Sequence, residues 1–434
     1  MQVTIIIERE ESTPIEFKAD VAMVGKMQTI SDIEAFLLSL SAQALPDLGE
    51  QLVSASQQDY ISKKKGKRNG TRQVEIHTLT GVYRVANQRY SYSDGSVGSY
   101  LEEVGGLTNG SYTLEFGNLI ETWANELSYA AVCRLIGAVT GTMQLSESGL
   151  QSYLSRKAAE ISADWVLTAQ AEQTITVVEN IDIYDADSPE VLLFMDDVCV
   201  KAQKPQKNVA RVDKDAKRLD TTTVLVESRT KGDFVPLTEG IDRTGRTIYP
   251  IQHAIMDTVI REHETTKPIP IVAITDGARS IRLCLFALFG TAICIILDWY
   301  HLRLKVKNLM SMIAPTKAYK ELYIKELSAL LWHGKVAEAL LYLTSLPAVK
   351  NEEARATLYT YIEKHGTEII DYGLRQQQGK TIGSGRGEKL NDTIVAHRQK
   401  KKGMAWSVIG SKSLAIIKTH QMQQKRNENL KCAA

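Results

Sequence analysis

Two short apolar runs that each end at a carboxylate constrain the fold of this chain most. Residues 191–195 precede Asp196, and residues 271–275 precede Asp276. The first run has five apolar residues, and the second has four followed by Thr275. Such runs without alternation are typical of strands buried on both faces, as in the parallel part of an α/β sheet. Because the carboxyl ends of parallel strands meet at one edge of a sheet, both carboxylates are expected at that edge.

The second half of the chain predicts an α/β core. Five strands are expected, and a helix over residues 248–263 precedes the fourth of them. Strand, strand, strand, helix, strand, helix, strand is the order of a ribonuclease H-like core. The strongly helical residues 316–375 predict an all-helical insertion into that core. The expected strands cover residues 191–195, 222–227, 234–239, 270–275 and 292–297.

A third carboxylate follows a glycine turn. Gly383-Ser384-Gly385 opens a predicted helix whose first turn carries Glu388, where the helix N-terminus favours an ionised carboxylate. A capping role paired to Ser384 is the alternative. Three carboxylates placed in this way are what two divalent ions, Mg²⁺ or Mn²⁺, need for in-line attack on a phosphodiester.

Each acid also has a structural interpretation. Asp196 is compatible with a turn or helix cap, and Asp276 with a strand-to-helix cap. Asp197 is an alternative ligand to Asp196, since adjacent strand residues face opposite sides of the sheet. Asp298 and His301 follow another apolar run. Such a pair is usually structural, but beside a metal site it could orient a ligand or touch a phosphate.

Composition limits the classes of protein to which the chain can belong. The chain has 434 residues and a net charge of +1, which predicts two to four domains and no strong bulk attraction to nucleic acid. The chain has no run of about 18 apolar residues, so no membrane span is predicted. The apolar residues at its start lack the basic flank of a signal peptide. The five cysteines form no CxxC pair, which indicates free thiols in a cytoplasmic protein.

Positive charge is concentrated locally, which suits contact with phosphates at chosen places. For any single cluster a solvated face is the bland alternative. The basic residues predicted to bind DNA are Lys63, Lys64, Lys65, Lys67, Arg68, Arg398, Lys400, Lys401 and Lys402.

The N-terminal part predicts a hairpin over residues 1–25 that is broken at Ser12-Thr13-Pro14, then a helix over 30–62. A second hairpin is expected over 72–85, joined at Thr80-Gly81.

Residues 114–153 are helical in pattern, with a break at Gly141-Thr142 and a restart capped by Ser146. This is compatible with a DNA-reading helix-turn-helix and equally with a plain helical hairpin. The predicted divisions are an α+β region 1–110, a helical segment 111–180, the core 190–308, the helical insertion 309–380, the end of the core 381–420 and a tail 421–434.

At these same positions the chain resembles the bacterial insertion-sequence DDE transposases of the ISKra group, relatives of the Mutator-like transposases. The similarity rests on Asp196, Asp276-Gly277-Ala278, Asp298-Trp299-Tyr300-His301 and residues 382–388, with a further match over 398–406. It covers roughly residues 70 to 415. It implies a ribonuclease H-like core with a helical insertion, two Mg²⁺ or Mn²⁺ ions, and DNA cleavage and strand transfer.

The resemblance assigns the metal ligands to Asp196, Asp276 and Glu388. Asp298 and His301 match an accessory pair, and His301 is expected to contact the scissile phosphate. Two departures stand out: Asp197 occupies a position that is usually glycine, and residues 88–95 lack the cysteines of the family's zinc ribbon.

The implied partners are double-stranded DNA with terminal inverted repeats, target DNA and further copies of the chain, in a dimer or larger assembly on the bacterial nucleoid. Two other functions stay open. One is a non-enzymatic DNA-binding protein derived from a transposase, and the other is a ribonuclease H-like structure-specific nuclease.

Overall fold

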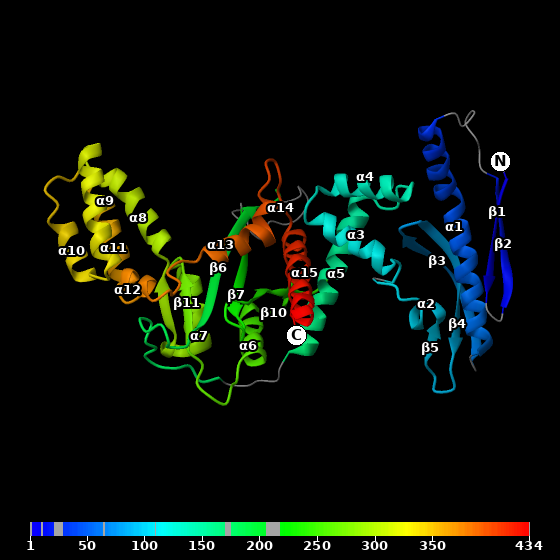
Figure 1. Cartoon of the computed structure of the whole chain (residues 1–434), viewed down its shortest axis with the longest axis horizontal. Coiled ribbons are helices and arrows are strands. Elements are labelled where there is room, and N and C mark those ends of the chain that lie inside the picture. Colours follow the sequence, from blue (N-terminus) through cyan, green and yellow to red (C-terminus); the bar gives the residue numbers. More distant parts are fainter. Residues whose placement is uncertain are drawn as a thin grey trace. The chain divides into compact units, whose positions relative to one another are not determined.

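A computed structural model describes residues 2–9, 12–20, 29–63, 66–108, 110–169, 175–204 and 218–433 of this mixed α/β chain (Figure 1). The chain divides into an N-terminal unit, residues 1–157, and a C-terminal unit, residues 158–434. The boundary lies within helix α5 (Glu147–Thr168). In the described part no helix is both long and apolar enough to cross a bilayer.

The N-terminal unit begins with an antiparallel hairpin, as predicted, but the predicted break is displaced. Ser12-Thr13-Pro14 opens the second strand instead of separating the two strands. Proline is tolerated there because it lies near the start of an edge strand. The next hairpin turns just before Gly81, whose φ of +129° favours glycine. The elements are β1 (Gln2–Arg9), β2 (Ser12–Asp20), α1 (Ile30–Lys63), β3 (Lys67–Thr78), β4 (Gly81–Ser91), β5 (Val97–Ser99) and α2 (Tyr100–Glu103).

Three helices follow: α3 (Leu114–Ala124), α4 (Tyr129–Thr140) and α5. Gly141 ends α4 in a left-handed conformation with φ of +73°. The predicted cap of α5 is confirmed, since Ser146 Oγ accepts the N–H of Gly149 at 3.1 Å.

A five-stranded sheet in the order β12-β11-β6-β7-β8 organises the C-terminal unit. β6, β11 and β12 are parallel, while β7 runs antiparallel to both of its neighbours. The predicted end of β6 is wrong: the strand continues past Asp196, because β7 keeps pairing with it after β11 has ended. The strands are β6 (Val191–Lys201), β7 (Arg218–Glu227), β8 (Phe234–Thr238), β11 (Ile271–Thr275) and β12 (Cys294–Leu297).

Helices cover both faces of this sheet. Leu193 and Met195 belong to a core shared with α6 (Ile251–Glu262) and α7 (Arg279–Phe289). Phe194 lies on the opposite face, where a Cβ on Gly387 would come within 3.2 Å of the Phe194 Cβ. That face carries α13 (Gly385–Asn391) and α15 (Val408–Ala433). Burial on both faces explains the unbroken apolar run in β6.

The helices that directly follow β12 form a bundle, drawn in yellow in Figure 1. This agrees with the helical pattern predicted over 316–375. After α13, a π-helical turn (Asp392–Ala396) and α14 (His397–Gln399) lead to α15, which continues through the predicted tail as far as Ala433. The bundle consists of α8 (Trp299–Ile313), α9 (Lys317–Trp332), α10 (Val336–Thr344) and α11 (Glu352–Lys364), with α12 (Tyr372–Gln377) beside it.

Candidate active site

Asp196 lies half-buried in the middle of β6, on the face that packs against α13. The Asp197 backbone N–H donates to its Oδ1 at 2.8 Å, and the Asn391 amide donates to its Oδ2. Burial raises the pKa of Asp196 to about 6, and the negative charge of Asp276 adds to the rise. The first acid therefore interacts electrostatically with the second.

Asp197 faces the opposite side of the strand. Its carboxylate accepts hydrogen bonds from Thr222 Oγ at 2.6 Å and from Ser280 Oγ, on α7, at 3.4 Å. These hydroxyls satisfy Asp197 away from α13. The geometry therefore puts Asp196, and not Asp197, on the side of the other candidate residues.

Asp276 follows the last residue of β11, as predicted. Its Oδ1 accepts the N–H of Ala278 at 2.8 Å. The turn requires Gly277, because φ is +84° and a Cβ there would lie 2.8 Å from Cε1 of His365. A helix-capping role is weak, since α7 begins after Ala278 and has no side-chain cap.

Asp298 joins the starts of two helices. Its Oδ1 accepts the His301 N–H at 2.8 Å and caps α8, while its Oδ2 accepts the Ser384 Oγ at 2.6 Å and the Ser384 N–H. Burial would raise the pKa of Asp298, but the hydrogen bonds from His301 and Ser384 outweigh it and lower the pKa to about 2. The buried carboxylate thus fixes the glycine turn that precedes Glu388.

Glu388 lies in the first turn of α13, as predicted, and its side chain is 54% exposed. Ser384 does not cap this helix with its side chain, since its hydroxyl is bound to Asp298. The capping alternative for Glu388 therefore has no hydrogen bond to support it.

His301 links Glu388 to the other acids. Its Nδ1 lies 3.5 Å from Asp298 Oδ1 and 3.7 Å from Glu388 Oε1. The interaction with Asp298 raises the pKa of His301 to about 9, with the charges of Glu388 and Asp276 adding to it against burial. At neutral pH the imidazole is therefore a cation surrounded by carboxylates.

The shifted His301 predicts a pH-dependent stability. Its folded pKa of about 9 exceeds its usual 6.5, so the contribution is complete below the usual value and is lost as pH rises through the folded one. In metal-free buffer with EDTA, the Tm of wild type should exceed that of His301→Gln at about pH 6, and the gap should close by about pH 10. An equal gap at both pH values would contradict a charged His301.

The donor chemistry fits a hard divalent cation. Carboxylate oxygens are the ligands that Mg²⁺ and Mn²⁺ prefer, and a cation would relieve the repulsion between Asp196 and Asp276. Within the described residues, however, no three His, Cys, Asp or Glu side chains stand close enough together to hold an ion. In this conformation the acids interact in pairs, with Glu388 drawn towards His301.

Sequence reasoning missed a buried ion cluster behind Asp276. Glu368 Oε1 lies 2.6 Å from Arg282 Nε on α7, and its Oε2 lies 2.6 Å from His365 Nδ1. His365 in turn packs against Gly277. The cluster connects the end of α11 to the turn that carries Asp276. A Glu three residues after a His was its only signal in the sequence.

The predicted DNA-binding residues lie in two separate places. In the N-terminal unit Lys63, Lys67 and Arg68 are exposed, while Lys64 and Lys65 lie outside the described residues. Of the predicted residues in the C-terminal unit, Lys400, Lys401 and Lys402 are exposed.

Arg398 is not one of the exposed cations. It is 3% exposed, and its guanidinium stacks over the Trp406 ring at 4.8 Å. The prediction that Arg398 contacts the DNA backbone is therefore wrong, because packing against Trp406 buries its side chain.

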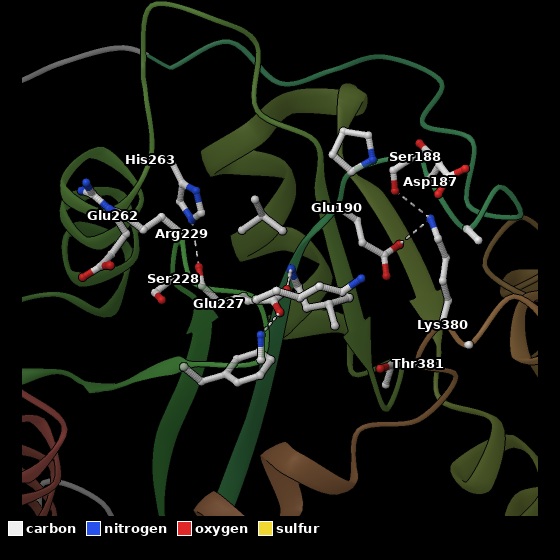
Figure 2. Close-up of a pocket in the computed structure, with 18 of the residues that line it drawn as sticks. Asp187, Ser188, Glu190, Glu227, Ser228, Arg229, Glu262, His263, Lys380 and Thr381 are labelled. Atoms are coloured by element: carbon white, nitrogen blue, oxygen red, sulfur yellow. Dashed lines mark hydrogen bonds and ion pairs between the residues drawn. The ribbon is translucent and has the colours of Figure 1, made fainter. Parts of the chain in front are cut away.

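A cavity of about 800 Å³ opens at the start of β6, and its lining does not include Asp196, Asp276 or Glu388. Figure 2 shows Lys380 and Glu190 on one side and Glu227 and His263 on the other. Lys380 Nζ donates to the Ser188 carbonyl at 3.1 Å, and Glu227 accepts the Gly232 N–H at 2.7 Å. Because these polar groups are bound within the protein, the cavity gives a weaker site than the carboxylates.

The arrangement joins two carboxylates that interact electrostatically, a partly exposed third and a cation, a combination that could stabilise charge on a transferring phosphoryl group. A scan against protein-family models and a search of curated proteins both found no match to this chain.

Proposed function

We propose that this chain is a DDE transposase, similar to the ISKra group, that cleaves DNA and transfers strands at the ends of an insertion sequence. The observation that carries the proposal is that Asp196, on β6, and Asp276, directly after the parallel neighbour β11, share one electrostatic site with Glu388 and His301.

The topology supports the same proposal. Three strands paired antiparallel are followed by two strands parallel to the first, which suits a ribonuclease H-like core. The bundle of α8 to α11 lies between the second and third acids in the chain, where the family places its helical insertion.

Asp196, Asp276 and Glu388 would hold the ions. Two bound divalent ions would activate the attacking hydroxyl and stabilise the leaving oxygen. The protein's own part is positioning and charge. His301, cationic at neutral pH, would donate a hydrogen bond to a non-bridging oxygen of the scissile phosphate. Asp298 holds His301 and the turn before Glu388 in one place.

DNA would be bound in both units. In the proposed arrangement, α4 and α5 act as a helix-turn-helix that reads the terminal inverted repeats. Lys400, Lys401 and Lys402, near the end of the core, contact the backbone. Two ends must be joined in transposition, so the active form would be a dimer or larger assembly.

The test is cleavage of labelled DNA that carries the element ends, in Mg²⁺ or Mn²⁺. Glu388→Gln keeps the shape of the side chain and removes its charge, so the nicking rate should fall at least about 100-fold while DNA binding persists. The matched control is Glu363→Gln, at an exposed position of α11, which should cleave like wild type.

Other outcomes would favour the remaining functions. Sequence-specific binding without cleavage, by wild type and in both metals, would point to a DNA-binding regulator. Cleavage that prefers branched DNA to repeat-ended DNA would point to a structure-specific nuclease.

A further inference from the structure

Asn391 is a buried amide that connects three elements of the C-terminal unit. It is 8% exposed and is the last residue of α13. Its Nδ2 donates to Oδ2 of Asp196 on β6, and its Oδ1 accepts from the Thr223 hydroxyl on β7. Asp196 and Thr223 are direct cross-strand partners. One side chain therefore bridges the neighbouring strands β6 and β7.

Thr223 determines which way the amide points. The threonine is 1% exposed, and its hydroxyl donates to the carbonyl oxygen of Asn391. The NH₂ group must then face Asp196, where it meets an acceptor. Buried polar chains of this kind, when fully hydrogen-bonded, fix a single arrangement of their members.

The same helix carries Glu388. Residues 388 and 391 are three apart, and side chains with this spacing lie on neighbouring parts of one helical face. Gly387 allows α13 to approach β6 closely. Directly after Asn391 the backbone widens into the π-helical turn (Asp392–Ala396), a feature often found at functional sites. The bond from Asn391 to Asp196 therefore also fixes the helix of the third acid relative to the first.

We propose that Asn391 is the positioning residue of the candidate site, holding the Asp196 carboxylate and setting its separation from Glu388, with Thr223 orienting the amide. This inference rests on the proposed function, because positioning matters only if the two carboxylates act together on one cation. Hydrogen-bond partners that orient metal ligands typically contribute 10- to 100-fold to metal affinity or activity.

The test uses Asn391→Leu, which is close in volume and removes both hydrogen bonds. Mn²⁺ binding is followed by the electron paramagnetic resonance signal of free Mn²⁺, without DNA or turnover. We expect the Kd for Mn²⁺ to rise about 10- to 100-fold. Thr223→Val keeps its shape and removes only the orienting donor, so a rise of about threefold is expected, well below that range. Thr223→Val also tests the proposal if Asn391→Leu does not fold.

The matched control is Asn125→Leu. Asn125 is 3% exposed and donates to the Glu121 carbonyl at 3.1 Å in the N-terminal unit. It should cost stability without changing Mn²⁺ binding. Wild-type Mn²⁺ affinity in folded Asn391→Leu would overturn the proposal and reduce Asn391 to a packing residue.

A second measurement separates this proposal from the proposed function. Thermal unfolding of Asn391→Leu, Asp196→Asn and the double variant should be non-additive by at least about 2 °C, since the two side chains are in contact. If wild type neither binds Mn²⁺ nor cleaves DNA, the proposed function fails. Additive Tm changes would then also contradict the interaction between Asn391 and Asp196. Non-additive Tm changes would support that interaction even though the proposed function had failed.

Discussion

Exchanging Asp196 for asparagine should lower metal-dependent DNA cleavage at least about 1000-fold, at the upper end for loss of one charge-stabilising group. Asp196 is half-buried and interacts with both Asp276 and His301, so its charge acts at the centre of the site. Asparagine keeps the size of the side chain and removes the charge. Single-turnover rates on labelled element-end DNA would measure the loss, and gel-shift titration should show unchanged DNA binding.

Asp197→Asn is the matched control for this prediction. The substitution is chemically identical and one residue away, but Asp197 faces Thr222 and Ser280 on the other side of β6. Cleavage should stay within about threefold of wild type, as expected for an exposed residue outside the site. Activity that survives in Asp196→Asn and disappears in Asp197→Asn would show that the strand presents the opposite face to DNA.

Much of the core could be predicted from hydrophobic pattern, because burial on both faces leaves a clear signal. The run before Asp276 and β11 end together at Thr275, and Gly277, with positive φ, follows two residues later. The run before Asp196 ends at Met195, yet β6 continues to Lys201. Its extension is stabilised by pairing with β7 alone, and a two-stranded extension needs no continuous apolar run. Strand length therefore depended on a partner that the local sequence does not reveal.

The polar residues were harder to place, because their partners are distant in the chain. Arg398 stands in a basic run and so suggested a solvent-facing cation, but Trp406 and Met404 cover it. Asn391 carried no signal at all, since asparagine in a short helix is ordinarily a surface residue. Its partner Asp196 is 195 residues away. Tertiary contacts of this kind override local pattern.

Arg375 provides the largest expected effect on stability. Its side chain is fully buried on α12, and both terminal nitrogens bind the Glu190 carboxylate at 3.0 Å. The guanidinium also donates to the carbonyls of Ile183 at 3.0 Å and Thr381 at 2.8 Å. Arg375→Met would remove this donor from both carbonyls and leave Glu190, among the described residues, with only the longer contact to Lys380, at 3.4 Å. The free energy of unfolding should therefore fall by about 3–5 kcal/mol, the range for breaking a buried ion pair.

Urea titration would measure this loss as a lower midpoint with an unchanged m-value. Adding Glu190→Leu to Arg375→Met should restore part of the stability, because the largely buried carboxylate that lost its arginine partner is then removed as well. Lys267→Met breaks an ion pair with Glu264 in which both side chains are exposed, so it should cost less than about 1 kcal/mol. A loss of that small size in Arg375→Met would mean that Lys380, 3.4 Å from Glu190, compensates the charge and that the arginine is not what holds α12 to the core.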